Sequence, residues 1–191
     1  MASDLGTVQG EVHDEAGTVL DFWFARSTEE QFGKDPALDA EIASRFDSLR
    51  ARLLATSAAG WRDAPEPLLA AIVVLDQFSR NIHRGTAAAY AADPLALELT
   101  LEAIGKGWED HYPREQRVFL YMPLMHAEDP AMQRLSMDRF AALGEEENLA
   151  FARDHAGVIG RYGRFPSRNA ALGRESTPAE RDYLSQPDAG W

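Results

Sequence analysis

Cysteine does not occur in the chain of 191 residues, which excludes disulfide bonds, thiolate metal sites, iron–sulfur clusters and cysteine nucleophiles. Its absence fits a reducing compartment. No run of apolar residues approaches the ~20 that a membrane-spanning helix needs. The first residues have neither the basic start nor the apolar run of a signal peptide. We therefore expect a cytoplasmic protein without a membrane partner.

Basic residues are scarce relative to acidic ones, because 19 Lys and Arg compare with 31 Asp and Glu and the formal net charge is −12. Such a surface repels nucleic acid, which requires a cationic face. The sequence also lacks a glycine-rich phosphate loop, an H-E-x-x-H motif and a recognised spacing of metal ligands. We predict no nucleic-acid partner, no metal and no cofactor.

The spacing of apolar residues along most of the sequence is typical of helices. Apolar residues recur every three or four positions after residue 36, as on one face of an amphipathic helix. They are Leu38, Ile42, Phe46, Leu49 and Leu53. This helix is predicted to begin with an N-cap residue followed by proline. The same pair of residue types occurs three more times and predicts three further helix starts. These pairs begin at Asp35, Asp93, Asp129 and Thr177.

The segment 65–85 is apolar nearly all round in its first half, as expected of a helix buried at the centre of a domain. Residues 113–125 and 145–162 also show helical patterning, and Pro123 predicts a kink or an early end in the first of them. Successive helices with short loops between them pack as antiparallel pairs. The sequence therefore predicts an all-α fold of antiparallel helix pairs.

The first residues are polar and contain glycine, which predicts a flexible N-terminal arm over residues 1–16. The aromatic group that follows could form a short strand, but Thr18 and Asp21 resemble a capping box and favour a helix that begins at Thr18. Residues 17–191 are then predicted to form one helical domain, a size that suits a single core.

A first concentration of polar side chains follows the apolar part of the segment 65–85. Its members are Asp76, Gln77, Arg80, Asn81 and Arg84. In a helix the two arginines and the aspartate lie four residues apart on one face, with the two amides in a parallel row. Buried charge is costly unless it is paired. The cluster is therefore either a structural ion pair that anchors loops or a site that receives a ligand.

A second concentration is basic, because four arginines and no acidic residue lie between positions 161 and 174. The planar guanidinium fork matches carboxylate and phosphate groups. Arg164, Arg168 and Asn169 are therefore candidates for an anion-binding pocket that is shared with the arginines of the first segment. The alternative is a solvated basic loop that pairs with the acidic surface.

His126 is the candidate for proton transfer, since histidine titrates near neutral pH and this one follows an apolar helix. A lone histidine near a core is more often a satisfied structural group. No pairing of His126 with Glu128 or His155 has a recognised metal-ligand spacing. We therefore assign no metal site to these residues.

Three sequence blocks, in their order and spacing, resemble the bacterial domain-of-unknown-function family 924. They are LDQFSRNIHRG from residue 75, FLYMPLMHAED from residue 119 and RYGRFPSRNAALGRESTP from residue 161. The likeness extends from residue 19 into the segment that starts at residue 176, which is nearly the whole chain. It implies an all-helical fold with tetratricopeptide-like, right-handed helical packing, and it implies no assigned reaction.

Three positions depart from what is common in that family. Ser79 occupies a position that is commonly proline, His83 one that is commonly aromatic, and Ser167 one that is commonly histidine. The last two changes argue against histidine chemistry in the second segment. The candidate site residues themselves match the family pattern.

The leading hypothesis is a pocket for a small anionic molecule or a carboxylate-bearing group. Charge would come from Arg80, Arg84, Arg164 and Arg168, orientation from Asp76, Gln77, Asn81 and Asn169, and proton transfer from His126. One alternative is a peptide-binding or scaffold module whose arginines clamp an acidic peptide or a C-terminal carboxylate. The other is a purely structural network. Whether the protein is an enzyme stays open at this point.

Overall fold

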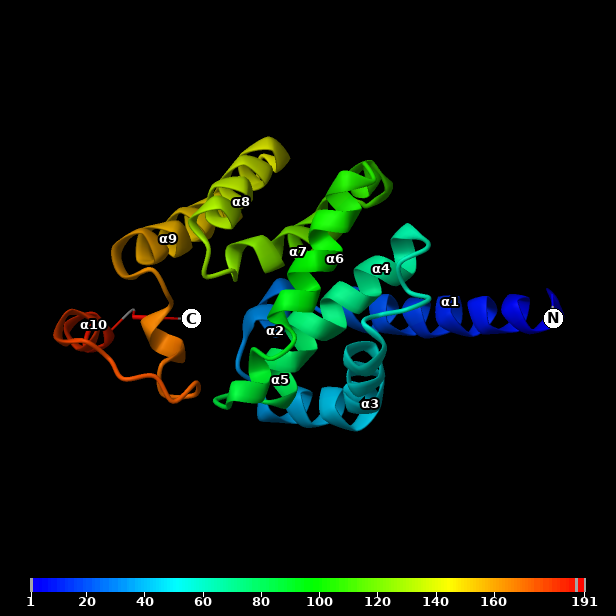
Figure 1. Ribbon diagram of the computed structural model, residues 1–191, viewed down its shortest axis with the longest axis horizontal. Helices are drawn as coiled ribbons and strands as arrows, with labels where there is room; N and C mark the ends of the chain where they lie inside the picture. Colours follow the sequence, from blue (N-terminus) through cyan, green and yellow to red (C-terminus); the bar gives the residue numbers. More distant parts are fainter. Residues whose placement is uncertain (1, 188, 191) are drawn as a thin grey trace.

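The computed structural model describes residues 2–187, 189 and 190, with side chains from residue 10 onward. Within this range the chain consists of helices and connecting turns and contains no strand, so the all-helical prediction is confirmed. The helix α1 extends toward one end of the molecule and α10 lies at the other (Figure 1). No helix in the described residues is long and apolar enough to cross a membrane.

The first helix, α1 (Ala2–Phe24), begins well before the predicted start at Thr18, so that start is wrong. Thr18 Oγ1 donates a hydrogen bond to Asp14 O at 2.9 Å, one turn back along the helix, instead of capping it. The second half of α1 carries residues that pack into the core, with Val19 and Trp23 fully buried. The flexible N-terminal arm over residues 1–16 stays a prediction.

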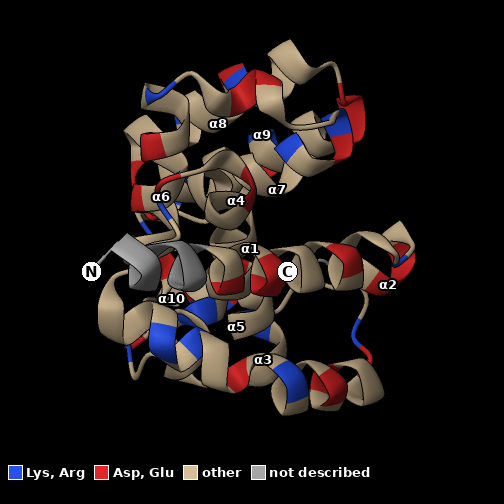
Figure 2. Cartoon of the chain, turned by 90° about the vertical axis from the view of Figure 1, so that its right-hand side faces the viewer, with Lys and Arg blue, Asp and Glu red and all other residues tan. Residues whose placement is uncertain are grey.

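The helix α3 (Pro36–Thr56) follows the predicted pattern closely. Asp35 caps it, because its Oδ1 accepts a hydrogen bond from Ala37 N at 2.8 Å. The apolar face is buried as expected: Leu38, Ile42, Phe46, Leu49 and Leu53. Basic and acidic residues both lie along the outer side of this helix (Figure 2). The short helix α2 (Thr28–Phe32) precedes it, with a capping box formed by Ser27 and Glu30.

The central segment starts as α4 (Pro65–Val73), widens into a π-helix at Val74–Phe78 and returns to α-helical form as α5 (Ser79–Ile82). Residues 67–78 are all buried. The helices α1, α6 (Asp93–Gly105) and α7 (Arg114–Met125) pack against α4. The apolar pattern predicted this central helix but contained no sign of the π-helical turn, a feature found frequently at functional sites.

The helices α8 (Pro130–Leu143) and α9 (Glu146–Tyr162) form a hairpin beside α7. Gly144 makes the turn between them with φ of +73°, a conformation that favours glycine. The chain then runs through a 3₁₀ turn at Pro166–Arg168 to α10 (Pro178–Leu184). Two more 3₁₀ turns lie at Ala87–Ala89 and Trp108–His111. Tetratricopeptide-like, right-handed packing of helix pairs stays a prediction.

Candidate functional site

Asp93 opens α6 but does not cap it. The structural N-cap is Ala92, and no side chain makes a capping hydrogen bond there. The carboxylate of Asp93 instead accepts hydrogen bonds from Arg80, with Oδ1 3.0 Å from Nη1 and Oδ2 3.1 Å from Nη2. Its Oδ2 also accepts from Arg168 Nη1 at 3.1 Å. One carboxylate thus connects the two arginine segments that the sequence singled out.

Asp76 lies on the π-helical turn and is almost fully buried, with a side chain that is 1% exposed. Its Oδ1 is 3.0 Å from Nη1 of Arg80, and its Oδ2 accepts a hydrogen bond from Gln77 Nε2 at 2.6 Å. Burial acts to raise the pKa of this carboxyl, but the charge of Arg80 and the hydrogen bonds from His126 and Gln77 outweigh burial and lower the pKa. Asp76 is therefore ionised at neutral pH.

His126 follows the last residue of α7 and is mostly covered, with a side chain that is 13% exposed. Burial, and then the charge of Arg80, lower its pKa, although Asp76 acts in the opposite direction. The ring is therefore neutral at pH 7. Since an ionised carboxylate only accepts, Nδ1 carries the proton and donates a hydrogen bond to Asp76. This tautomer leaves Nε2 as the hydrogen-bond acceptor.

Arg168 completes the cluster from the 3₁₀ turn near the C-terminal end. Its guanidinium carbon lies 4.7 Å from the ring centre of Tyr90 and 4.5 Å from that of Phe165. Its Nη2 donates a hydrogen bond to the backbone oxygen of His126 at 3.0 Å. Contacts with two aromatic faces and a carbonyl hold this guanidinium in one orientation.

The charges of the buried cluster balance. Two carboxylates, Asp76 and Asp93, face two guanidiniums, Arg80 and Arg168, while His126 is neutral. Burying charge is costly unless each charge has a partner and hydrogen bonds, and here each has both. The arrangement can therefore hold a neutral, oriented imidazole in a largely dry setting.

Two predicted site residues bind a different carboxylate. Asn81 Nδ2 donates to Asp39 Oδ1 at 2.8 Å. Arg84 forms two hydrogen bonds to the same carboxylate, at 2.8 Å from Nε and 2.9 Å from Nη2. These bonds connect α5 and the turn that follows it to the first turn of α3.

Arg164 and Asn169 bind a third carboxylate, that of Glu180 on α10. Arg164 donates to it from Nε at 2.7 Å and from Nη2 at 2.9 Å. Asn169 Nδ2 lies 3.4 Å from Glu180 Oε2 and 3.0 Å from Ser176 Oγ. The nine predicted residues thus divide into a group around Asp76, with Gln77, Arg80, His126 and Arg168, and two pairs that bind other acidic side chains.

Residues 19–188 match the family described as "Bacterial protein of unknown function (DUF924)". The chain belongs to this family. A solved structure of a protein of unknown function from Agrobacterium tumefaciens is 40% identical and superposes with a TM-score of 0.86. The match covers 90% of this chain and 97% of that one. Among curated proteins, no match was found.

Sequence reasoning missed two parts of the candidate site. Asp93 was interpreted as a helix cap, and Tyr90 was not singled out at all. Neither has a local signal of its role, because their partner Arg168 is 75 residues away from Asp93 along the chain. A hollow of about 310 Å³ also lies beside α7 and α8, and none of the predicted site residues lines it.

Proposed function

We propose that Asp76, Arg80, His126 and Arg168 form a site that binds a small carboxylate-bearing or otherwise anionic molecule, with His126 as the proton acceptor. The observation that carries the proposal is the orientation of His126. Its Nδ1 is 2.8 Å from a buried, ionised carboxylate and carries the proton, so its Nε2 is the nitrogen with a lone pair. A fixed, neutral imidazole of this kind is what a general base requires.

The two arginines supply the anion-binding part of the site. They already hold a carboxylate, that of Asp93, in a bidentate arrangement on Arg80 with a further bond from Arg168. Their geometry therefore suits a carboxylate. Asp93 has a side chain that is 17% exposed, so a ligand can approach the guanidinium edges where this carboxylate meets solvent.

A purely structural network would also pair these guanidiniums with buried carboxylates. A structural network and a binding site differ in their response to added ligand. A ligand that binds the native state of the protein raises its midpoint of thermal unfolding, whereas a purely structural network binds no ligand and gives no such rise. A peptide-binding module would respond to a short acidic peptide and not to small anions.

The experiment is thermal unfolding with formate, acetate, malonate, citrate and a short acidic peptide, each at the same ionic strength as a sodium chloride reference. We expect a small carboxylate to raise the midpoint of the wild-type protein and to have no such effect on Arg168→Gln. The matched control is Arg84→Gln, because Arg84 binds Asp39 outside the cluster. An equal rise in the Arg168→Gln variant, or none in the wild type, would refute the proposal.

A further inference from the structure

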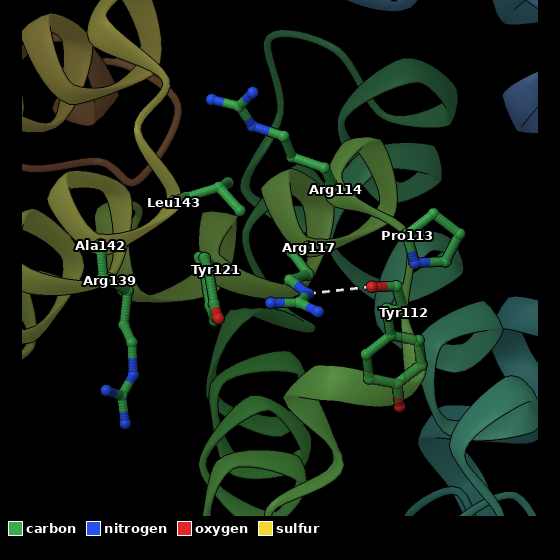
Figure 3. A pocket seen from close by; sticks show the side chains of 8 residues that line it. All are labelled: Tyr112, Pro113, Arg114, Arg117, Tyr121, Arg139, Ala142 and Leu143. Atoms are coloured by element: carbon green, nitrogen blue, oxygen red, sulfur yellow. Dashed lines mark hydrogen bonds between the residues drawn. The ribbon is translucent and has the colours of Figure 1, made fainter.

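The helices α7 and α8 lie side by side and run in opposite directions. Arg114 and Arg117 from the start of α7 line the same hollow as Ala142 and Leu143 from the end of α8 (Figure 3). The end of α7, which His126 follows, therefore lies beside the start of α8. Side chains near the start of α8 are placed to reach the backbone around His126.

The backbone carbonyls at the end of α7 have no partner inside the helix, as at every helix end. Three consecutive carbonyls there, those of residues 125–127, each accept a hydrogen bond from a side chain. Gln133 Nε2 donates to Met125 O at 2.7 Å and to Ala127 O at 2.8 Å. Arg168 Nη2 donates to the carbonyl between them, that of His126, at 3.0 Å. Side chains thus hold the backbone on both sides of His126.

Gln133 belongs to α8 and is 2% exposed. A backbone carbonyl only accepts, so the NH2 end of the amide faces the two carbonyls and both of its N–H groups are used. The other end, Oε1, is buried and makes no hydrogen bond within the part of the chain that the structure describes. A buried amide with an unmet acceptor is costly. The two N–H groups therefore account for an amide at this position.

The ring of His126 is bonded to another part of the chain. Its Nδ1 donates a hydrogen bond to Asp76 on the π-helical turn of the central segment, at 2.8 Å. The imidazole is joined to its own backbone through a short methylene link. A shift of the backbone around His126 therefore moves Nδ1 away from Asp76.

We infer that Gln133 is a positioning residue for His126, which holds the backbone on both sides of it so that Nδ1 stays bonded to Asp76. The part that Gln133 has in ligand binding rests on the function proposed above. A residue that served only to end α7 would have a different effect when replaced. The ring of His126 would then keep its tautomer, because Asp76 alone would hold it.

The test is nitrogen-15 NMR of the histidine rings at pH 7.5, which distinguishes a protonated ring nitrogen from one with a lone pair. His126→Gln identifies the signals of His126 among the five histidines of the chain. The wild type should show a single tautomer of His126, with the proton on Nδ1. Gln133→Met has a side chain of similar size without the N–H donors, and it should show both tautomers in exchange.

The matched control is Thr100→Val. Thr100 is fully buried, and its Oγ1 donates to the carbonyl of Leu120 in the middle of α7 at 3.0 Å. The substitution also removes a buried hydrogen bond to a carbonyl of α7, so both variants should lower the midpoint of thermal unfolding. Only Gln133→Met should change the signals of His126. The same change in Thr100→Val, or an unchanged single tautomer in Gln133→Met, would overturn the inference.

A second variant, Gln133→Asn, replaces Gln133→Met where that protein does not fold. Its NH2 group is a methylene shorter in reach and cannot span both carbonyls, so it too should show both tautomers. Acetate and malonate, each compared with sodium chloride at equal ionic strength, test the proposed function separately and should move the Nε2 signal of wild-type His126. A signal that neither moves counts against the proposed function, whereas the tautomers in the Gln133 variants still decide the role of Gln133.

Discussion

The carboxylate of Asp76 lies 2.8 Å from Nδ1 of His126 through Oδ1 and 3.0 Å through Oδ2. This contact joins the π-helical turn of the central segment to the end of α7, two places that are 50 residues apart in the chain. It determines which nitrogen of the imidazole carries the proton. The tautomer of His126 therefore depends on a residue that is itself almost inaccessible to solvent.

Asp76→Asn should be strongly destabilising. The variant leaves Arg80 and His126 without the buried carboxylate that they share, and loss of one partner from a buried ion pair typically costs about 3 kcal/mol or more of unfolding free energy. Urea denaturation at pH 7.5 measures this loss. Glu41→Gln is the control, because the side chain of Glu41 is 46% exposed where it pairs with Arg45 and should contribute below about 1 kcal/mol. Losses of similar size in the two variants would contradict the assignment of a buried pair.

Stability should fall as the pH drops below 6.5, the ordinary pKa of histidine. Burial lowers the pKa of His155 to about 3, so the unfolded chain takes up a proton there before the folded chain does. The stability that this group contributes is complete above pH 6.5 and declines toward pH 3 by up to about 1.4 kcal/mol per pH unit. His126 adds to the decline, because its pKa is lowered as well.

The measurement is urea denaturation at several pH values between 7.5 and 5. His155→Gln should reduce the slope of unfolding free energy against pH by the contribution of one histidine. His111→Gln, which changes an exposed residue on a 3₁₀ turn, should keep the wild-type slope. The same slope for His155→Gln and the wild type would show that burial does not keep His155 neutral.

Asp93→Ala should create a binding site for a free carboxylate. The substitution removes the group that bridges Arg80 and Arg168, and we expect a loss of about 3 kcal/mol from the two guanidiniums left without it. Formate or acetate fits the vacated position and should restore part of the unfolding midpoint. Sodium chloride at equal ionic strength is the reference, and equal effects of chloride and formate would show that the guanidiniums do not bind a carboxylate specifically.

Ser79→Ala should destabilise the fold through Arg50. This arginine is buried, and its Nε donates to Ser79 Oγ at 2.7 Å while its Nη2 donates to Ala88 O at 2.8 Å. Without the hydroxyl, a buried N–H loses its acceptor, at a cost of about 1–3 kcal/mol. Ser185→Ala, at the end of α10, should change the unfolding free energy by about 0.5 kcal/mol or less. A Ser79→Ala variant as stable as the wild type would mean that another acceptor replaces the hydroxyl.

Much of the fold could be predicted because its signals are local. The spacing of Leu38, Ile42 and Phe46 identifies the buried face of α3, and Asp35 caps that helix as its proline neighbour indicates. The start of α1 was missed, because the polar residues and glycine before it predicted a flexible arm and a helix that begins at Thr18, whereas the helix begins at Ala2. Propensity is a weak guide at such helix ends.

The residue types of the candidate site were also visible in the sequence, since Asp76, Arg80, His126 and Arg168 were all named from their chemistry. Which carboxylate each arginine binds was decided only by the tertiary structure. Arg168 is bonded to Asp93 across 75 residues, whereas Arg164, from the same segment, is bonded to Glu180. Helical periodicity and capping act over a few neighbouring residues, but the pairing of charges depends on which helix ends the folded chain brings together.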